Sequence, residues 1–169
     1  MKRKSRIIIG CLLGLLISSA LAASVTVKMF RTSKDGKSGA FLGVVTFKDT
    51  QYGLLIKPNL QNLSPGLHGF HVHAKPSCKD MGLAAGGHFD PAHTDKHLGP
   101  YSSNGHLGDL PALYVNSKGM ATLPILAPRL KVSELKDHAI MIQAGGDNYS
   151  DVPKKLGGGG ARIACGIPG

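Results

Sequence analysis

The stretch GLHGFHVHA, residues 66–74, alternates along its length in the way a half-buried strand does. It places His71 and His73 two residues apart, so both imidazoles project from one side of the extended chain, roughly 6.5 to 7 Å apart at the backbone. This spacing lets two rings reach one metal ion. Because the chain has eight histidines, the pair alone also fits two ordinary strand histidines, and the surrounding sequence has to decide.

Similar short alternating segments recur along the chain, each bounded by Gly, Asp, Asn or Pro. They lie at residues 24–30, 41–47, 53–60, 66–74, 110–116, 119–126, 138–144 and 162–167. Only residues 133–137 fit a helical turn. Eight short strands with almost no helical periodicity predict an all-β fold, an eight-stranded barrel or sandwich with Greek-key connections.

Two long segments interrupt this strand pattern, residues 75–109 and residues 145–160. Segments of this length inside a compact domain are usually functional or disordered. The first is crowded with histidine, and the second ends in four consecutive glycines, 157–160. No Gly-Lys-Ser/Thr follows those glycines, so the sequence does not indicate a phosphate-binding loop. We expect two functional loops.

The first 22 residues resemble a secretory signal peptide in organisation. A basic start, MKRKSR, precedes an apolar stretch at residues 7–21, and Ala20-Leu21-Ala22 is the small-x-small pattern that signal peptidase cuts. We therefore expect residues 23–169 to form the mature domain, periplasmic or secreted, with no stable membrane insertion. A retained anchor would need a longer apolar run, and a lipoprotein attached through Cys11 would need a longer hydrophobic region before that cysteine.

The charge of the mature domain limits the partners that we expect for it, and its cysteine content indicates a disulfide. Residues 23–169 carry 16 basic and 10 acidic side chains, an excess that attracts small anions. No basic helix or aromatic-interleaved basic stripe indicates nucleic acid. Two cysteines remain, Cys78 and Cys165, and an even pair in an exported domain most simply forms one disulfide. Strand alternation does not decide between a monomer and a homodimer.

The first long segment contains a complete set of ligands for a tetrahedral ion. His88, His97, His106 and Asp109 supply three imidazoles and one carboxylate, the donor set that zinc accepts in a site without an open position. A loop of this length has no core of its own, so metal binding would supply ordering free energy. The alternative is a solvated polar loop with scattered histidines. Six of the eight histidines fall in residues 71–106, which favours the metal site.

Several ordered motifs together resemble the secreted bacterial copper-zinc superoxide dismutases. They are LHGFHVH at 67–73, AGGHFDP at 85–91, GHLGDLP at 105–111, AGGDN at 144–148 and RIACG at 162–166. The resemblance covers nearly all of the mature chain. It implies an enzyme that converts superoxide to oxygen and hydrogen peroxide, with copper and zinc as cofactors and the superoxide anion as substrate.

The resemblance also implies roles for individual residues. The copper ligands it implies are His71, His73 and His88; the zinc ligands are His88, His97, His106 and Asp109. His88 would bridge the two ions and return a proton during turnover. Arg162 would guide superoxide to copper, Asp147 would orient ligands of both ions, and Cys78 and Cys165 would form the family disulfide.

One position departs from the family pattern. Gln143 stands where that pattern leads us to expect a fourth copper histidine, and a neutral amide is a poorer copper ligand than imidazole. His138, five residues away, has the opposite strand parity and does not substitute. We favour a functioning dismutase with weakened copper binding. The alternatives are a zinc-ordered metal-binding protein with little catalysis and, in a third class, an adhesion module on a β-sandwich.

Two further histidines have ordinary interpretations. Strand parity turns His68 to the face opposite His71, where a hydrogen-bonded structural role is expected. His93 lies in the metal loop after the tetrahedral set is filled, and we expect it to be exposed to solvent.

Overall fold

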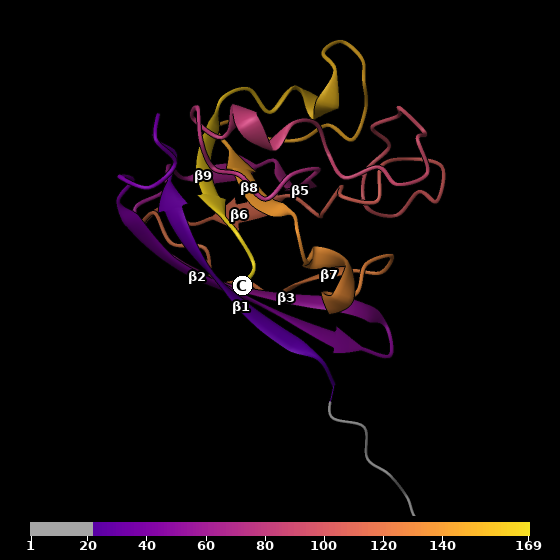
Figure 1. Ribbon diagram of the computed structural model, residues 1–169, viewed down its shortest axis with the longest axis horizontal. Helices are drawn as coiled ribbons and strands as arrows, with labels where there is room; N and C mark the ends of the chain where they lie inside the picture. The colour runs from indigo at the N-terminus through magenta and orange to yellow at the C-terminus, as the bar shows by residue number, and fades with distance from the viewer. Residues whose placement is uncertain (1–21) are drawn as a thin grey trace, which may run out of the picture.

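The computed structural model describes residues 22–169, which form nine strands and three short 3-10 turns (Figure 1). The strands are β1 (Ser24–Arg31), β2 (Phe41–Thr50), β3 (Gly53–Leu60), β4 (Gly66–His68), β5 (Phe70–His73), β6 (Leu113–Val115), β7 (Ile125–Ala127), β8 (Ala139–Gln143) and β9 (Arg162–Gly166). Among these residues no helix has the length and apolar character needed to cross a membrane. The predicted signal peptide falls, except for its last residue, outside the described part of the chain.

Seven strands form one antiparallel sheet in the order β5-β8-β9-β1-β2-β3-β7, and β4 pairs with β6 in a second. Strand β9 lies beside β1 and β5 lies beside β8, although these partners are far apart in the sequence. Such neighbours are what Greek-key connections produce. The predicted all-β class is therefore confirmed.

The meander β1-β2-β3 supplies one wall of the core. Its inward side chains are buried and alternate with exposed lysines, as period-two patterning requires. The inward set includes Val27, Met29, Val45, Phe47 and Ile56. Each buried apolar side chain of this size contributes roughly 1.5 to 3 kcal/mol.

Strands β5 and β8 are buried on both faces. Phe70 and Val72 point into the main core. Because side chains alternate along a strand, His71 and His73 lie on the opposite face. Their register partners on β8, Met141 and Ala139, lie on that face too. The two long segments lie over this end of the sheet, salmon and gold in Figure 1.

The strand predicted at 66–74 is interrupted at Gly69. Gly69 N–H donates to Gly145 O at 2.7 Å, outside any strand ladder, and the chain passes there from the small sheet into the large one. This break accounts for nine strands where eight were predicted. The strand predicted at 119–126 is also shorter, because Pro124 has no N–H to donate, and pairing with β3 resumes only at Ile125.

The other local predictions differ from the structure only in extent. The helical turn expected at 133–137 is a 3-10 turn at Val132–Leu135. Two more turns, Leu83–Ala85 and Leu156–Gly158, lie inside the long segments. Such single turns are too short to produce the helical periodicity on which sequence prediction depends.

Cys78 and Cys165 form the predicted disulfide, with Cα atoms 5.7 Å apart. The bridge joins the first long segment to β9 across 87 residues. In the chain-entropy description, closing a loop of that length stabilises the folded state by roughly 4 to 5 kcal/mol. It also fixes the segment close to Arg162, three residues before Cys165 on the same strand.

Candidate metal centre

Strand β5 places His71 and His73 side by side, both fully buried, with ring centroids 6.2 Å apart. His71 Nε2 donates to Asp147 Oδ2 at 2.7 Å, and His73 Nδ1 donates to Gly86 O at 3.0 Å. Each ring is therefore oriented through one nitrogen. The other nitrogens, His71 Nδ1 and His73 Nε2, are buried without a hydrogen-bond partner.

The first long segment lies across β5 at both of its ends. Val72 N–H donates to Gly108 O, and Val72 O accepts from Phe89 N–H, each at 2.8 Å. A Cβ at Gly108 would lie 2.3 Å from Val72 O, so this close approach requires glycine. These contacts bring His88, which precedes Phe89, and Asp109, which follows Gly108, close to the two histidines of β5.

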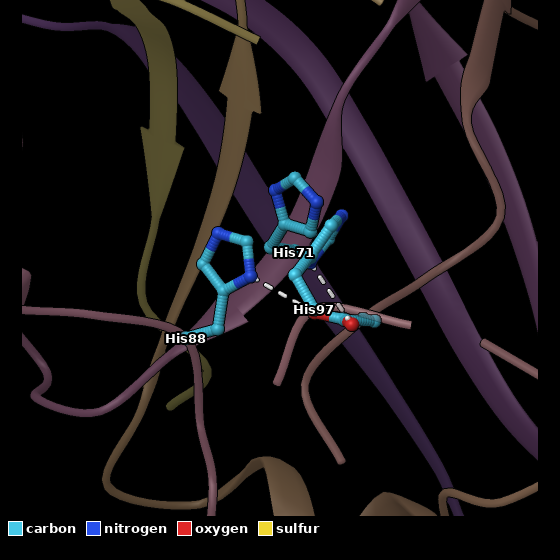
Figure 2. A group of neighbouring side chains, drawn as sticks. His71, His88 and His97 are labelled. Carbon is cyan, nitrogen blue, oxygen red and sulfur yellow. Dashed lines mark hydrogen bonds and ion pairs between the residues drawn. The ribbon is translucent and has the colours of Figure 1, made fainter. Parts of the chain in front are cut away.

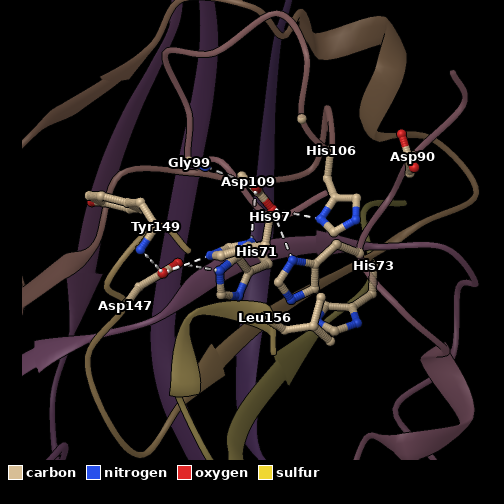
Figure 3. A network of polar contacts seen from close by, with 12 residues as sticks. His71, His73, Asp90, His97, Gly99, His106, Asp109, Asp147, Tyr149 and Leu156 are labelled. Carbon is tan, nitrogen blue, oxygen red and sulfur yellow. Dashed lines mark hydrogen bonds and ion pairs between the residues drawn. The ribbon is translucent and has the colours of Figure 1, made fainter. Parts of the chain in front are cut away.

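Three histidines of the first long segment converge on Asp109. Figure 3 shows His97 and His106 beside Asp109, and Figure 2 shows His88 and His97 next to His71. His88 Nδ1 is 2.9 Å from Asp109 Oδ1, His97 Nδ1 is 3.0 Å from Oδ2, and His106 Nδ1 is 3.5 Å from Oδ1. Only the first of these contacts has hydrogen-bond geometry, so the Nδ1 atoms of His97 and His106 have no partner. The four residues are at most 6% exposed.

Asp147, in the second long segment, joins the two groups of histidines (Figure 3). Its Oδ2 accepts from His71 Nε2 and its Oδ1 from His97 Nε2, each at 2.7 Å. Tyr149 N–H holds Oδ1 at 2.8 Å. Gly157 covers this bridge, with φ +73° and a position at which a Cβ would lie 2.0 Å from Asp147 Oδ1.

His88 lies between the two groups. It stacks on His71 with ring centroids 3.9 Å apart, and its centroid is 5.0 Å from that of His73 and 5.2 Å from that of His97. Its Nδ1 faces Asp109, and its Nε2 is buried without a partner. The ligand atoms of His71, His88, His97 and Asp109 all lie within 4.8 Å of one another.

Gln143 completes the set of buried polar atoms without partners. Its side chain is 5% exposed, and its Oε1 accepts no hydrogen bond. Buried polar groups are normally paired, so unpaired ones need an explanation. Across the described residues the unpartnered buried side-chain atoms are His71 Nδ1, His73 Nε2, His88 Nε2, His97 Nδ1, His106 Nδ1 and Gln143 Oε1. Their clustering is what a site for cations would produce, because each can offer a lone pair.

Hydrogen bonds to backbone oxygens hold Arg162 next to the same centre. Its guanidinium donates to Gly82 O and Gly86 O, each at 2.6 Å. Gly86 O also accepts from His73 Nδ1. The cation is thus held next to the histidine pair. An open pocket of about 380 Å³ is lined by Gln143 and Arg162 together with Lys154 and Lys155.

Burial and hydrogen bonding set the charges of these groups. Burial is the main cause that lowers the pKa of His73 to about 3 and the pKa of His88 to about 3. Burial also opposes a charge on His97, but the Asp109 carboxylate 3.0 Å from its Nδ1 and the hydrogen bond from its Nε2 to Asp147 outweigh burial and raise the pKa of His97 to about 9. The imidazoles around Asp109 and Asp147, with His106 first for Asp109 and His71 first for Asp147, hold the pKa of both carboxyls well below the usual range, against burial.

The metal-free protein is expected to be most stable at about pH 6 to 7. His73 and His88 titrate near 3 when folded and near 6.5 when unfolded, so their stabilisation is lost as the pH falls through that window, by at least roughly 3 kcal/mol. His97 titrates near 9 when folded, so its stabilisation is lost as the pH rises from 6.5 to 9. Urea unfolding in excess chelator checks this, and His97→Gln should flatten the alkaline limb. A profile that still rises at pH 9 would contradict it.

The remaining histidines lie outside the centre. His68 is 1% exposed, with Nδ1 2.7 Å from Gln143 O and Nε2 2.8 Å from Ser64 O, the structural role predicted for it. His93 is exposed, as predicted. His138 packs on the Phe89 ring and bonds to the backbone of His73. It does not take the place of Gln143.

Some supporting residues were not predicted from the sequence. The Tyr149 hydroxyl accepts from Ala112 N–H at 2.8 Å, and Asp151 accepts from the backbone N–H of His97 and Leu156. The contact of Asp151 with His97 fixes the second long segment on the first, and the contact of Tyr149 fixes it on Ala112, just beyond the first. The sequence signals only that aspartate and glycine are frequent there, which does not say what either residue contacts.

The fold and its side chains define an all-β protein with a buried cluster of side chains that could hold metal ions, in which one imidazole lies between two groups. Residues 41–167 match the family described as copper/zinc superoxide dismutase (SODC), and the chain belongs to this family. It is 56% identical to Cu-Zn superoxide dismutase 1 of Salmonella typhimurium, over 95% of this chain and 96% of that protein. It is 53% identical to Cu-Zn superoxide dismutase of Photobacterium leiognathi, over 88% of each.

A solved structure extends this similarity to the fold. Cu/Zn superoxide dismutase from Brucella abortus superposes with a TM-score of 0.79 at 46% identity, over 86% of this chain and 99% of that chain. The family resemblance seen in the motifs and the Greek-key fold expected from the strand pattern are both confirmed.

Proposed function

We propose that this protein is a superoxide dismutase that converts two superoxide anions and two protons to oxygen and hydrogen peroxide. The observation that carries this proposal is the position of His88, whose Nδ1 faces Asp109 and whose Nε2 is unpartnered beside His71 and His73. One ring can thus serve two ions. The names of the relatives support the enzyme over a zinc-ordered protein without catalysis.

The donors present fit the two metals of the family. On one side, His71, His73 and His88 offer three imidazole nitrogens, a set suited to copper. On the other, His88, His97, His106 and Asp109 offer three nitrogens and a carboxylate, a closed set suited to zinc. Bound copper would supply the one-electron redox chemistry, and zinc would order the ligands.

The residues of the chain bind and protonate the substrate. Arg162, Lys154 and Lys155 line one pocket with Gln143, so an anion that enters meets permanent positive charge next to the histidines. His88 Nε2 has no hydrogen-bond partner, so it would be free to take up a proton whenever it does not hold copper, while Nδ1 stays on the Asp109 side. That proton leaves with the peroxide product. Asp147 keeps His71 and His97 in the orientation that aims their Nδ1 atoms inward.

Superoxide consumption by copper- and zinc-loaded protein tests the function, and Arg162→Ala tests the route of the anion. The variant should consume superoxide about tenfold more slowly and show a weaker dependence on salt, since a fixed cation steers an anionic substrate. Metal stoichiometry should not change, because Arg162 bonds only to backbone oxygens.

Arg31→Ala is the matched control, since Arg31 bonds a backbone oxygen outside the centre, Asn62 O. Equal rates in all three proteins would exclude a role for Arg162, and no consumption by the loaded wild-type protein would exclude the enzyme.

The disulfide and the relatives also support a location for the protein. The disulfide needs an oxidising compartment, and the close relatives are bacterial. We infer a periplasmic protein whose residues 1–22 are removed on export.

A further inference from the structure

Four of the buried side-chain atoms without partners belong to His88 and to the neighbouring strands β5 and β8. They are His71 Nδ1, His73 Nε2, His88 Nε2 and Gln143 Oε1. The opposite nitrogen of each ring faces an oxygen that can only accept, from Asp147, Gly86 or Asp109. In the neutral rings the proton is therefore on that opposite nitrogen, and the inward nitrogen carries a lone pair. All four inward atoms are acceptors, and no donor faces them.

The backbone holds the Gln143 amide at this place. Gln143 follows Met141 on the histidine-bearing face of the sheet and lies opposite Gly69, bonded through its N–H to Gly69 O at 2.9 Å. A Cβ at Gly69 would lie 2.6 Å from Gln143 Oε1 and 3.1 Å from His71 Cε1. A Cβ at Gly159 would lie 1.8 Å from Oε1. Two glycines thus leave room for the amide beside His71.

We propose that Gln143 Oε1 is the fourth donor of this pocket and that it makes the pocket select divalent ions over Cu(I). Three imidazoles and one neutral oxygen suit Zn(II) and Cu(II), whereas Cu(I) gains little from an amide oxygen. Once His88 carries a proton on Nε2, only His71 and His73 remain as strong donors for Cu(I). Zinc therefore competes effectively for this pocket in the protein as it exists.

The inference rests on the proposed function, because it concerns the same pocket, but its test needs no superoxide. Protein loaded first with one equivalent of zinc is titrated anaerobically with Cu(I) against a chromophoric chelator, and separately with a second equivalent of Zn(II). The compared proteins are wild type, Gln143→His, Gln143→Leu and the exposed-site control Gln61→His.

Gln143→His should raise Cu(I) affinity at least tenfold more than Zn(II) affinity, because only the imidazole is a strong Cu(I) donor. Gln143→Leu, which removes the oxygen but keeps the bulk, should lower the affinity for the second Zn(II) about tenfold and change Cu(I) affinity less than threefold. Gln61→His should change neither.

Parallel shifts of both affinities in Gln143→His, or unchanged Zn(II) binding in Gln143→Leu, would overturn the inference. Such results would leave dismutation untouched. Conversely, a wild-type protein that shows these selectivities but does not consume superoxide would exclude the enzyme and keep the inference.

Discussion

Treating the metal-loaded protein with a chelator is expected to raise tryptic cleavage within residues 75–109 by at least about 100-fold. The segment contains few buried apolar side chains, and Leu83 and Leu98 on it are 61% and 41% exposed. Its order depends on ligands that converge on Asp109. A metal present at 1,000 times its dissociation constant stabilises the closed state by about 4 kcal/mol, or roughly 1,000-fold in the population of the open state.

Two histidines of the same segment provide matched variants for this experiment. His93→Ala removes an exposed ring and should leave the effect of the chelator unchanged. His97→Ala removes a fully buried ring between two carboxylates and should be cleaved rapidly with or without chelator. Fragments ending at Lys79 or Lys96 identify the segment by mass spectrometry. Equal cleavage of the wild type under both conditions would show that metal does not order it and would favour the adhesion module.

The elements that follow from local patterning could be predicted from the sequence. Alternation in β1 to β3 reflects a buried face such as that of Val27 and Met29, which is a property of neighbouring residues. The two-residue spacing of His71 and His73 likewise predicts, from neighbouring residues alone, that both side chains lie on one face of the strand. The disulfide followed from compartment and number of cysteines. All of these inferences need only local sequence or composition.

Features that depend on contacts between distant segments could not be predicted in this way. The break at Gly69 arises because its N–H pairs with Gly145, 76 positions along the chain. Position 157 needs a glycine because a Cβ there would collide with the Asp147 carboxylate. The Tyr149 hydroxyl matters because it accepts a hydrogen bond from the Ala112 N–H. The family resemblance supplied a role for Asp147, but the pair of 2.7 Å bonds that performs it appears only in the folded chain.

Asp147→Asn is expected to weaken metal binding on both sides of the centre by about 10- to 100-fold. The carboxylate accepts from His71 through one oxygen and from His97 through the other. Asparagine has only one acceptor oxygen and can adopt either amide orientation, so neither His71 nor His97 is held all the time. Each ring can then rotate its Nδ1 away from its metal. His97 also loses one of the two carboxylates that raise its pKa, so its folded pKa should fall toward 6.5.

Asp95→Asn is the matched control for this substitution, because it removes the same charge from an exposed position with a left-handed backbone that asparagine tolerates. Competition titrations with zinc and copper, together with the NMR titration of His97 in the metal-free proteins, measure the effect. Loss of affinity for only one metal would contradict the view that Asp147 couples the two sides. The expected result is loss of affinity for both metals, with unchanged affinity in Asp95→Asn. One carboxylate holds a ring in each group of histidines, and neither ring has another side-chain acceptor at its Nε2.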